Sequence, residues 1–221
     1  MSPPQPDSAD HYFSASPAGP SARREIELVL PEGRLIRLVT DAGVFSADKV
    51  DAGTRILLSE GPPVDTAEVL VDVGCGYGAI AVSLALRAPE AHVWAVDVNE
   101  RARDLCALNA DANGVGDRVT VVSPDDVPTD LVADQIWSNP PIRVGKQALH
   151  ELLRTWLGRL RPATGTATLV VQKHLGADSL ARWLEAEGWP TERVVSRAGY
   201  RILSVAASAD RIHTTTGKAA P

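Results

Sequence analysis

The chain has 221 residues, of which 44% are hydrophobic, 23% are charged and two are cysteines, and its net charge is −6 at pH 7. This length and apolar content suit one large domain with tails, and no apolar run is long enough to span a membrane. Two cysteines are too few for a disulfide framework, and no metal-ligand spacing is present. The N-terminus has no basic region followed by an apolar core, which argues against a signal peptide, so we expect a cytoplasmic protein. We also expect a monomer without metal or membrane association.

The charged residues are unevenly distributed along the chain. Residues 1–142 carry ten Lys and Arg against 22 Asp and Glu, whereas residues 143–221 carry 12 against six. The acidic total argues mildly against a nucleic-acid partner, but the basic second part allows a local basic face that could contact RNA. Solvated helix faces would give the same counts, so both interpretations stay open.

The N-terminal part of the chain predicts a tail followed by a β-hairpin. Residues 1–20 are rich in Pro, Ser and Ala and are expected to be disordered, except that the aromatic cluster His11-Tyr12-Phe13 could dock on the domain. Apolar and polar residues then alternate at 24–30 and at 34–40, on either side of Pro31-Glu32-Gly33. Such alternation around a turn predicts two antiparallel strands.

A helix is expected at residues 50–59, where Gly61-Pro62-Pro63 stops it. We expect residues 21–66 to form the hairpin and this helix, packed on a catalytic domain at 67–208. Residues 209–221 are expected to form a loose tail.

From residue 69 onward, predicted strands and helices alternate. The strands are expected at 69–73, 92–96, 119–122, 135–138, 166–172, 192–196 and 202–206, and the helices at 79–87, 100–113, 145–161 and 177–187. The last two strands are joined by a segment too short for a crossover helix, so they should pair antiparallel. The expected fold is therefore α/β and Rossmann-like, with a seven-stranded, mostly parallel sheet, an antiparallel last strand, and an N-terminal β-hairpin.

A glycine-rich loop follows the first strand of this sheet. Residues 69–82 read V-L-V-D-V-G-C-G-Y-G-A-I-A-V, with Gly74, Gly76 and Gly78 on alternate positions and Asp72 just before them. Glycines at a strand-to-helix turn let the backbone approach a ligand closely. The spacing G-x-G-x-G is not the dinucleotide fingerprint G-x-G-x-x-G, and it resembles motif I of the class I S-adenosylmethionine (SAM) methyltransferases.

Acidic residues follow the next strands, where ligands of such sheets bind. Asp97, with Val98 beside it, ends the second strand 19 residues after Gly78 and would accept hydrogen bonds from ribose hydroxyls. Asp125 or Asp126 would accept from the adenine amino group, although a plain polar turn would explain this pair as well. In the loop itself, Asp72 could hold loop amides or lie near the methionine amino group, Tyr77 is expected to form a wall of the cofactor pocket, and Cys75 is expected to pack rather than react.

The fourth strand ends in Asn139-Pro140-Pro141-Ile142, which suits methylation of an amine. The lone pair of an exocyclic amine on a planar base is conjugated, so this amine is a poor nucleophile. The Asn139 side-chain oxygen and a nearby main-chain carbonyl could each accept one N–H, and the prolines would keep that carbonyl free of ladder partners. Catalysis would then rest on orientation and on acceptors placed for developing positive charge.

With these motifs, the chain resembles the small-domain methyltransferases of the RsmC type, in a single-domain bacterial branch. The resemblance extends from about His11 to Ala206 and is carried by the segments H-Y-F-S-A-S-P, G-V-F-S-A-D-K-V-D-A-G-T, D-V-G-C-G-Y-G, S-N-P-P-I-R-V-G-K, V-V-Q-K-H-L-G-A and R-A-G-Y-R-I-L. It implies SAM as cofactor, guanine N2 of 16S ribosomal RNA as methyl acceptor, and ribosomal RNA or the small ribosomal subunit as partner.

The resemblance also implies roles for residues outside the two main motifs. Phe45, Ser46 and Thr54 would lie along the cofactor entrance, and four residues would face RNA: Arg143, Lys146, Lys173 and His174. Two features depart from the family. RsmC is similar to a tandem of two such domains whereas this chain has room for one, and the fourth motif position is Ile142 instead of an aromatic residue, so Phe45 could supply the ring.

Three other functions remain open on the sequence alone. Glutamine methylation of release factors also uses N-P-P, but usually with Tyr at the fourth position and a helical N-terminal domain. DNA adenine methylation would normally need a longer target-recognition region than any insertion here provides. A non-catalytic SAM-fold module that binds RNA is the third, and the intact loop glycines, Asp97 and Asn139 argue against it.

Overall fold

The computed structural model of the chain describes residues 20–208. The predicted C-terminal tail and residues 1–19 of the predicted N-terminal tail, including the aromatic cluster at His11–Phe13, lie outside this range. The strands are β1 (Arg24–Val29), β2 (Leu35–Thr40), β3 (Val69–Val73), β4 (His92–Val96), β5 (Val119–Val122), β6 (Gln135–Ser138), β7 (Thr166–Gln172), β8 (Thr191–Arg197) and β9 (Tyr200–Ala206). The α-helices are α1 (Ala52–Glu60), α2 (Ala79–Arg87), α3 (Glu100–Ala112), α4 (Lys146–Leu157) and α5 (Ala177–Ala186).

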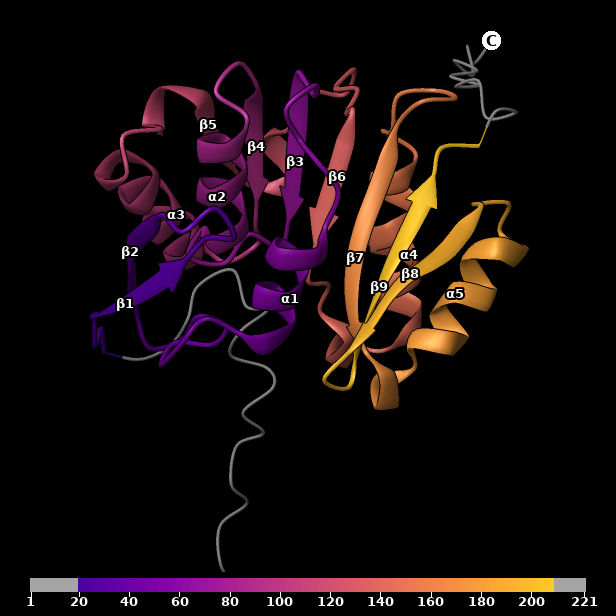
Figure 1. The fold of residues 1–221 in the computed structure, drawn as a ribbon, viewed down its shortest axis with the longest axis horizontal. Coiled ribbons are helices and arrows are strands. Elements are labelled where there is room, and N and C mark those ends of the chain that lie inside the picture. The colour runs from indigo at the N-terminus through magenta and orange to yellow at the C-terminus, as the bar shows by residue number, and fades with distance from the viewer. Residues whose placement is uncertain (1–19, 209–221) are drawn as a thin grey trace, which may run out of the picture.

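A seven-stranded sheet in the order β5-β4-β3-β6-β7-β9-β8 forms the centre of the molecule (Figure 1). Strands β3 to β7 pair in parallel, and β9 runs antiparallel between β7 and β8. The expected sheet with its antiparallel last strand is confirmed. The order reverses between β3 and β6, and such a switch point leaves a crevice at the carboxyl ends of the strands where ligands bind.

Two apolar clusters cover the two faces of this sheet. One joins buried residues of α1, α2, α3 and the N-terminal strands, and it includes Leu38, Leu57 and Leu84. The other joins α4 and α5 to the opposite face, and it includes Trp156 and Leu180. The strands read as nearly continuous apolar runs because a parallel sheet with helices on both sides is buried on both faces.

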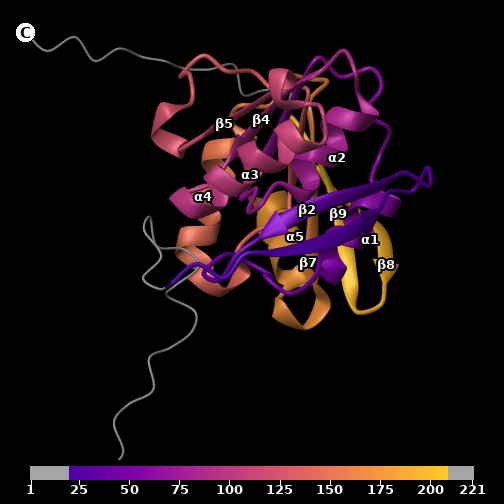
Figure 2. The ribbon, with the colours of Figure 1, turned by 90° about the vertical axis from the view of Figure 1, so that its left-hand side faces the viewer.

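The N-terminal hairpin packs outside this layered core. Strands β1 and β2 pair antiparallel around the predicted turn, which confirms the expected hairpin. The hairpin crosses the front of the molecule in Figure 2, and β2 contacts α3. There the Asn109 side chain acts as a substitute for a strand partner, because its Oδ1 accepts from Val39 N at 2.7 Å and its Nδ2 donates to Val39 O at 2.8 Å.

Helix α4 is shorter than the expected range of 145–161. It ends at Leu157, with Gly158 as its C-cap. The chain then turns so that Ala133 N donates to Arg159 O and Arg161 N donates to Ala133 O. This short parallel bridge needs extended backbone at Leu160, which the helical periodicity of the segment does not reveal.

No helix within residues 20–208 is long and apolar enough to cross a bilayer. In the same range, no group of three or more His, Cys, Asp or Glu side chains is arranged to hold a metal ion.

Candidate active site

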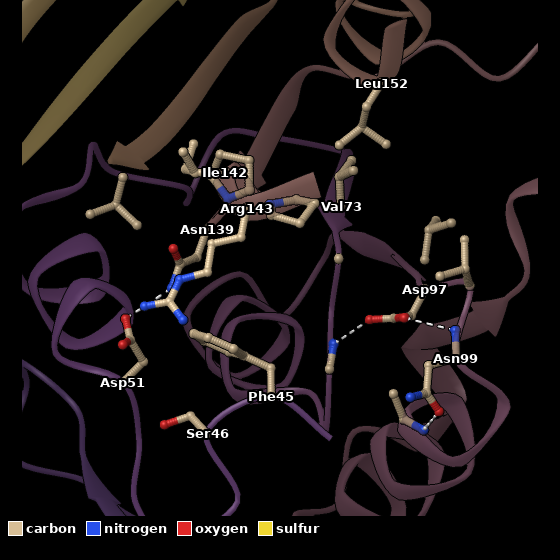
Figure 3. A pocket seen from close by; sticks show the side chains of 18 of the residues that line it. Phe45, Ser46, Asp51, Val73, Asp97, Asn99, Asn139, Ile142, Arg143 and Leu152 are labelled. Carbon is tan, nitrogen blue, oxygen red and sulfur yellow. Dashed lines mark hydrogen bonds between the residues drawn. The ribbon is translucent and has the colours of Figure 1, made fainter. Parts of the chain in front are cut away.

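A cavity of about 420 Å³ opens at the carboxyl ends of β3, β4, β6 and β7. This volume lies within the usual range for small-molecule sites. Figure 3 shows two sides of this cavity. Asp97 and Asn99 lie on one side of the cavity, whereas Phe45, Asp51, Asn139 and Arg143 gather on the other.

The loop after β3 brings two of its glycines to the cavity. Gly74 and Gly76 line it with φ angles of 77° and 55°. A Cβ built at either position meets nothing within 4 Å, so the missing side chains leave backbone accessible to a ligand. The loop is fixed to the end of β4, because Gly74 N and Cys75 N both donate to Val96 O, at 2.8 and 3.1 Å.

Asp97 lies at the tip of β4 and lines the cavity beside the loop. Its Oδ2 accepts from Gly76 N and its Oδ1 from Asn99 N, both at 2.9 Å. Each carboxylate oxygen can accept a further hydrogen bond, so both remain able to bind ligand hydroxyls. Burial raises the pKa of Asp97, while the backbone hydrogen bonds and Arg103 oppose this shift.

Asp72 is fully buried beneath the same loop. Its Oδ2 accepts from Ala81 N at 3.0 Å at the start of α2, and its Oδ1 has no partner among residues 20–208. Burial raises the pKa of Asp72 to about 8, and the nearby Asp97 carboxylate adds to the shift. Asp72 therefore ties β3 to α2, whereas the loop amides are held by Asp97 and Val96.

We expect Asp72→Asn to gain stability relative to the wild type as the pH rises. Asp72 keeps its proton in the folded state up to about pH 8, whereas the unfolded chain releases it near the ordinary value of about 3.9. The stability that Asp72 contributes is therefore complete below the unfolded value and is lost as the pH rises through the folded one, by up to about 1.4 kcal/mol per pH unit. Urea unfolding of both proteins without ligand, at about pH 5, 7 and 9, measures the difference, and a constant difference would contradict the raised pKa.

Gly78, the third loop glycine, is the N-cap of α2 with φ at 91°. A Cβ there would lie 2.8 Å from Cys106 Sγ and 3.2 Å from Cys106 Cα on α3. The glycine therefore allows α2 and α3 to pack closely behind the loop.

We expect Gly78→Ala to lower the free energy of unfolding by roughly 2–4 kcal/mol, since left-handed backbone strain and overpacking both contribute. Gly33→Ala is the matched control, because Gly33 has φ at 87° and nothing within 4 Å of a built Cβ. Its free energy of unfolding should fall by only about 1 kcal/mol, because backbone strain alone contributes. Chemical denaturation measures both variants, and equal losses would show that the contact with Cys106 is unimportant.

The Asn139-Pro140-Pro141-Ile142 segment follows β6, and all four residues line the cavity. The Asn139 amide nitrogen donates to Asp51 Oδ2 at 2.9 Å and to Thr54 Oγ1 at 3.1 Å. The Pro140 carbonyl has a partner within a turn, and this partner does not belong to a sheet ladder. It accepts a hydrogen bond from Ile142 N at 2.8 Å, within a tight turn, and keeps one lone pair.

The structure brings about half of the expected site residues to the cavity lining. Ten of them line it: Phe45, Gly74, Gly76, Asp97, Val98, Asn139, Pro140, Pro141, Ile142 and Arg143. Phe45 is 48% exposed there. Ser46, expected at the cofactor entrance, lines the cavity as well.

Other expected residues lie away from the cavity lining. Five are buried around it: Thr54, Asp72, Cys75, Tyr77 and Gly78. The Tyr77 ring lies in the core and not in the cavity wall. At the tip of β5, Pro124 lines the cavity, whereas Asp125 and Asp126 are exposed on a 3-10 turn. The side chains of Lys146, Lys173 and His174 are exposed outside it.

Several further residues, which no sequence motif indicated, complete the cavity. Gln172 ends β7 and Tyr200 begins β9, and Gln172 Nε2 donates to the Tyr200 hydroxyl at 2.7 Å. Leu152 and Trp156 of α4 form an apolar wall, and Asp51 stands at the start of α1. The start of an antiparallel strand lies at the edge where the parallel strands end, so topology alone could have indicated Tyr200.

The switch-point cavity, the glycine loop and the acid at the tip of β4 together define a class I methyltransferase fold, whose methyl donor is SAM. Residues 35–204 match the methyltransferase small domain family, and the chain belongs to that family. The family expected from the sequence is thus confirmed.

Individual relatives agree with this assignment. The chain is 33% identical over 198 residues to the uncharacterized protein YbxB of Bacillus subtilis, covering 88% of this chain and 97% of that protein. It is 31% identical over 189 residues to the ribosomal RNA small subunit methyltransferase C of Hahella chejuensis, covering 81% of this chain and 52% of the relative. The chain therefore spans about half the length of that curated relative.

A solved structure is similar as well. The 16S rRNA N2 methyltransferase RsmC of T. thermophilus, in complex with AdoMet and guanosine, matches with a TM-score of 0.70 and 26% identity. The match covers 85% of this chain and 51% of that chain.

Proposed function

We propose that this protein transfers the methyl group of SAM to an exocyclic amine, and that the amine is guanine N2 of small-subunit (16S) ribosomal RNA. The observation that carries the proposal is the position of Asn139. Both amide N–H groups of Asn139 are used by other side chains, so its Oδ1 is the polar atom left for a ligand at the cavity. An acceptor at this place suits a substrate that presents N–H groups.

The cofactor would occupy the side of the cavity that Asp97 and the loop glycines line. Asp97 would accept from the ribose hydroxyls, and the exposed backbone of Gly74 and Gly76 would follow the ligand. When bound, SAM supplies a methyl group on a sulfonium centre, whose carbon–sulfur bond breaks as the amine lone pair attacks.

The chain's own contribution is orientation of that amine. Asn139 Oδ1 would accept one N–H, and the remaining lone pair of the Pro140 carbonyl would accept the other. Two such acceptors would fix the orientation of the amine nitrogen and stabilise the positive charge that develops on it. The amine nitrogen then releases one proton to solvent, so no strong general base is needed.

Several features support an RNA base as the acceptor. Phe45 and Ile142 give the cavity apolar surface for a planar ring, and Phe45 could provide the aromatic contact that Ile142 lacks. Stacking on aromatic side chains is how proteins usually hold a base taken from single-stranded RNA. Arg143 lines the cavity. Lys146 is exposed at the start of α4, and Lys173 and His174 are exposed just after the end of β7. The RsmC relatives point to the same substrate class.

The experiment is transfer of labelled methyl from SAM to small ribosomal subunits and to total RNA, both lacking this modification, followed by nucleoside analysis. We expect label in N2-methylguanosine of the small-subunit RNA. Label in large-subunit RNA or in another nucleoside would overturn the assigned target, and label in a protein digest would favour glutamine. SAM binding with no transfer to any acceptor would favour a non-catalytic module.

A further inference from the structure

The segment Asp51-Ala52-Gly53-Thr54 opens α1 and contacts Asn139 across 85 to 88 positions of the sequence. Asp51 has two partners there. Its Oδ2 accepts from Thr54 N at 3.1 Å, which caps the helix, and from Asn139 Nδ2 at 2.9 Å. The cap alone would explain an Asp at this position, but the hydrogen bond to Asn139 connects the helix start to the methyl-transfer site.

We infer that Asp51, assisted by Thr54, is a positioning residue that determines which end of the Asn139 amide faces the reacting amine. The inference rests on the proposed function, in which Asn139 Oδ1 accepts an amine N–H. It goes further by assigning the orientation of Asn139 to two residues of another element.

An amide side chain can occupy its site in two orientations. An Asn can rotate so that its oxygen and its NH₂ group exchange places at almost no steric cost. Only the oxygen can accept an N–H from the substrate, whereas the NH₂ group would oppose it donor to donor. A site that relies on Asn139 therefore needs a feature that selects one orientation.

The Asp51 carboxylate provides that selection. With Asn139 as it stands, Nδ2 donates to the carboxylate and to Thr54 Oγ1, so both amide hydrogens are used. If the amide rotated, its Oδ1 would lie 2.9 Å from a carboxylate oxygen that can only accept. A hydrogen bond to a charged acceptor is stronger than one between neutral groups, and it also polarises the amide so that Oδ1 becomes a better acceptor.

The Asp51 carboxylate and the Tyr200 ring both lie close to Gly53. A Cβ built at Gly53 would lie 2.8 Å from Asp51 Oδ2 and 2.7 Å from Cε1 of Tyr200. Thr54 is 6% exposed, so its hydroxyl is fixed in the core. The absence of a side chain at Gly53 thus allows the carboxylate, the Tyr200 ring and Asn139 to meet at one end of the cavity.

The test is a double-mutant cycle between Asp51 and Asn139, with methyl transfer to unmodified 16S ribosomal RNA at saturating SAM as the readout. Asp51→Ser keeps a good helix cap but is too short to reach Asn139. We expect it to lower kcat by about tenfold or more, the scale of one charge-assisted hydrogen bond, while the Kd for SAM and the thermal midpoint stay close to wild type. In the Asn139→Ala background, Asp51→Ser should change kcat by less than about twofold, because Asp51 acts through Asn139.

Three further variants separate positioning from structure. Asp51→Asn retains one oxygen that can accept from both partners, so it should restore kcat to within a few-fold of wild type. Thr54→Val removes the second acceptor at nearly equal size and should lower kcat, and Thr54→Ser, which keeps the hydroxyl, should lower it less. Asp48→Ser changes an exposed acid of the neighbouring loop and should have no effect.

Unchanged kcat in Asp51→Ser, or an equal loss with and without Asn139, would overturn the positioning role. If the kcat of Asp51→Ser falls together with its thermal midpoint, and Asp51→Asn does not restore kcat, Asp51 acts only as a helix cap. If Asn139→Ala alone kept full activity, the proposed function itself would fail, and this outcome is seen before Asp51 is changed.

Discussion

Asn139→Ala is expected to lower kcat for methyl transfer by roughly two or more orders of magnitude, which is the scale seen when one preorganised polar group is removed from an active site. Asn139 lies at the end of β6 with its amide hydrogens directed to Asp51 and Thr54. Removing the side chain removes an acceptor that holds the amine, while Asp97 and the loop glycines on the cofactor side are untouched. The Kd for SAM should therefore change by only a few-fold.

The measurement combines calorimetric titration of SAM with single-turnover methyl transfer, so that binding and chemistry are separated. Gln147→Ala, on the exposed side of α4, is a suitable control because it changes an amide outside the cavity. Equal losses of cofactor binding and turnover would show that Asn139 serves the cofactor. Full turnover in the variant would falsify the role of Asn139 in orienting the amine.

The fold could be predicted largely from the sequence because its signals are local. Apolar runs with glycine or an acid at their ends predict the buried strands, and five of the strands of the main sheet have the expected bounds: β3, β4, β5, β6 and β7. The insertion of β9 between β7 and β8 was not predicted in detail. A short connection predicts that two strands pair, but it does not tell which of them joins the rest of the sheet.

Site residues could be predicted where a single residue at a strand end has a recognisable chemical role. Gly74, Gly76, Asp97 and Asn139 are single positions at strand tips, and the sheet topology alone brings them to one cavity. The two adjacent acidic residues after β5, Asp125 and Asp126, behave differently. Pro124 begins a 3-10 turn there, and Asp126 accepts from Ser123 Oγ at 2.6 Å, so the two carboxylates point to solvent and the proline lines the cavity.

Contacts between side chains of distant segments were not predictable, even where topology could place one of the residues at the cavity. The pattern of Asp51 followed three residues later by Thr54 is that of an ordinary helix cap, and its second role depends on how α1 packs against the end of β6. Gln172 and Tyr200 become partners only because β7 and β9 pair antiparallel. No periodicity or motif in the sequence encodes such a contact, since each residue has an adequate local explanation.

Asp97→Ala is expected to have the opposite effect from Asn139→Ala, weakening the binding of SAM before it affects turnover. Each oxygen of the Asp97 carboxylate accepts one backbone N–H and has capacity for one ribose hydroxyl. Loss of two hydrogen bonds to a charged group, at roughly 1.5–3 kcal/mol each, should raise the Kd for SAM by about a hundredfold or more. The loop should also loosen, because Gly76 N loses its acceptor.

Asp97→Asn is not a conservative change at this position. An amide has one acceptor oxygen, so its NH₂ group would have to face either Gly76 N–H or Asn99 N–H, donor to donor. We therefore expect Asp97→Asn to weaken SAM binding nearly as much as Asp97→Ala. Asp104→Ala on the exposed face of α3 is the matched control and should bind SAM normally.

The two site variants together separate the two sides of the cavity. At saturating SAM, the Asp97 variants should recover most of their kcat, whereas Asn139→Ala should not, because the loss in the first case is in binding and in the second in chemistry. If saturating SAM fails to restore the Asp97 variants while their Kd is unchanged, Asp97 contributes to the reaction itself. The division of the cavity into a cofactor side at β3 and β4 and an acceptor side at β6 and α1 would then be wrong.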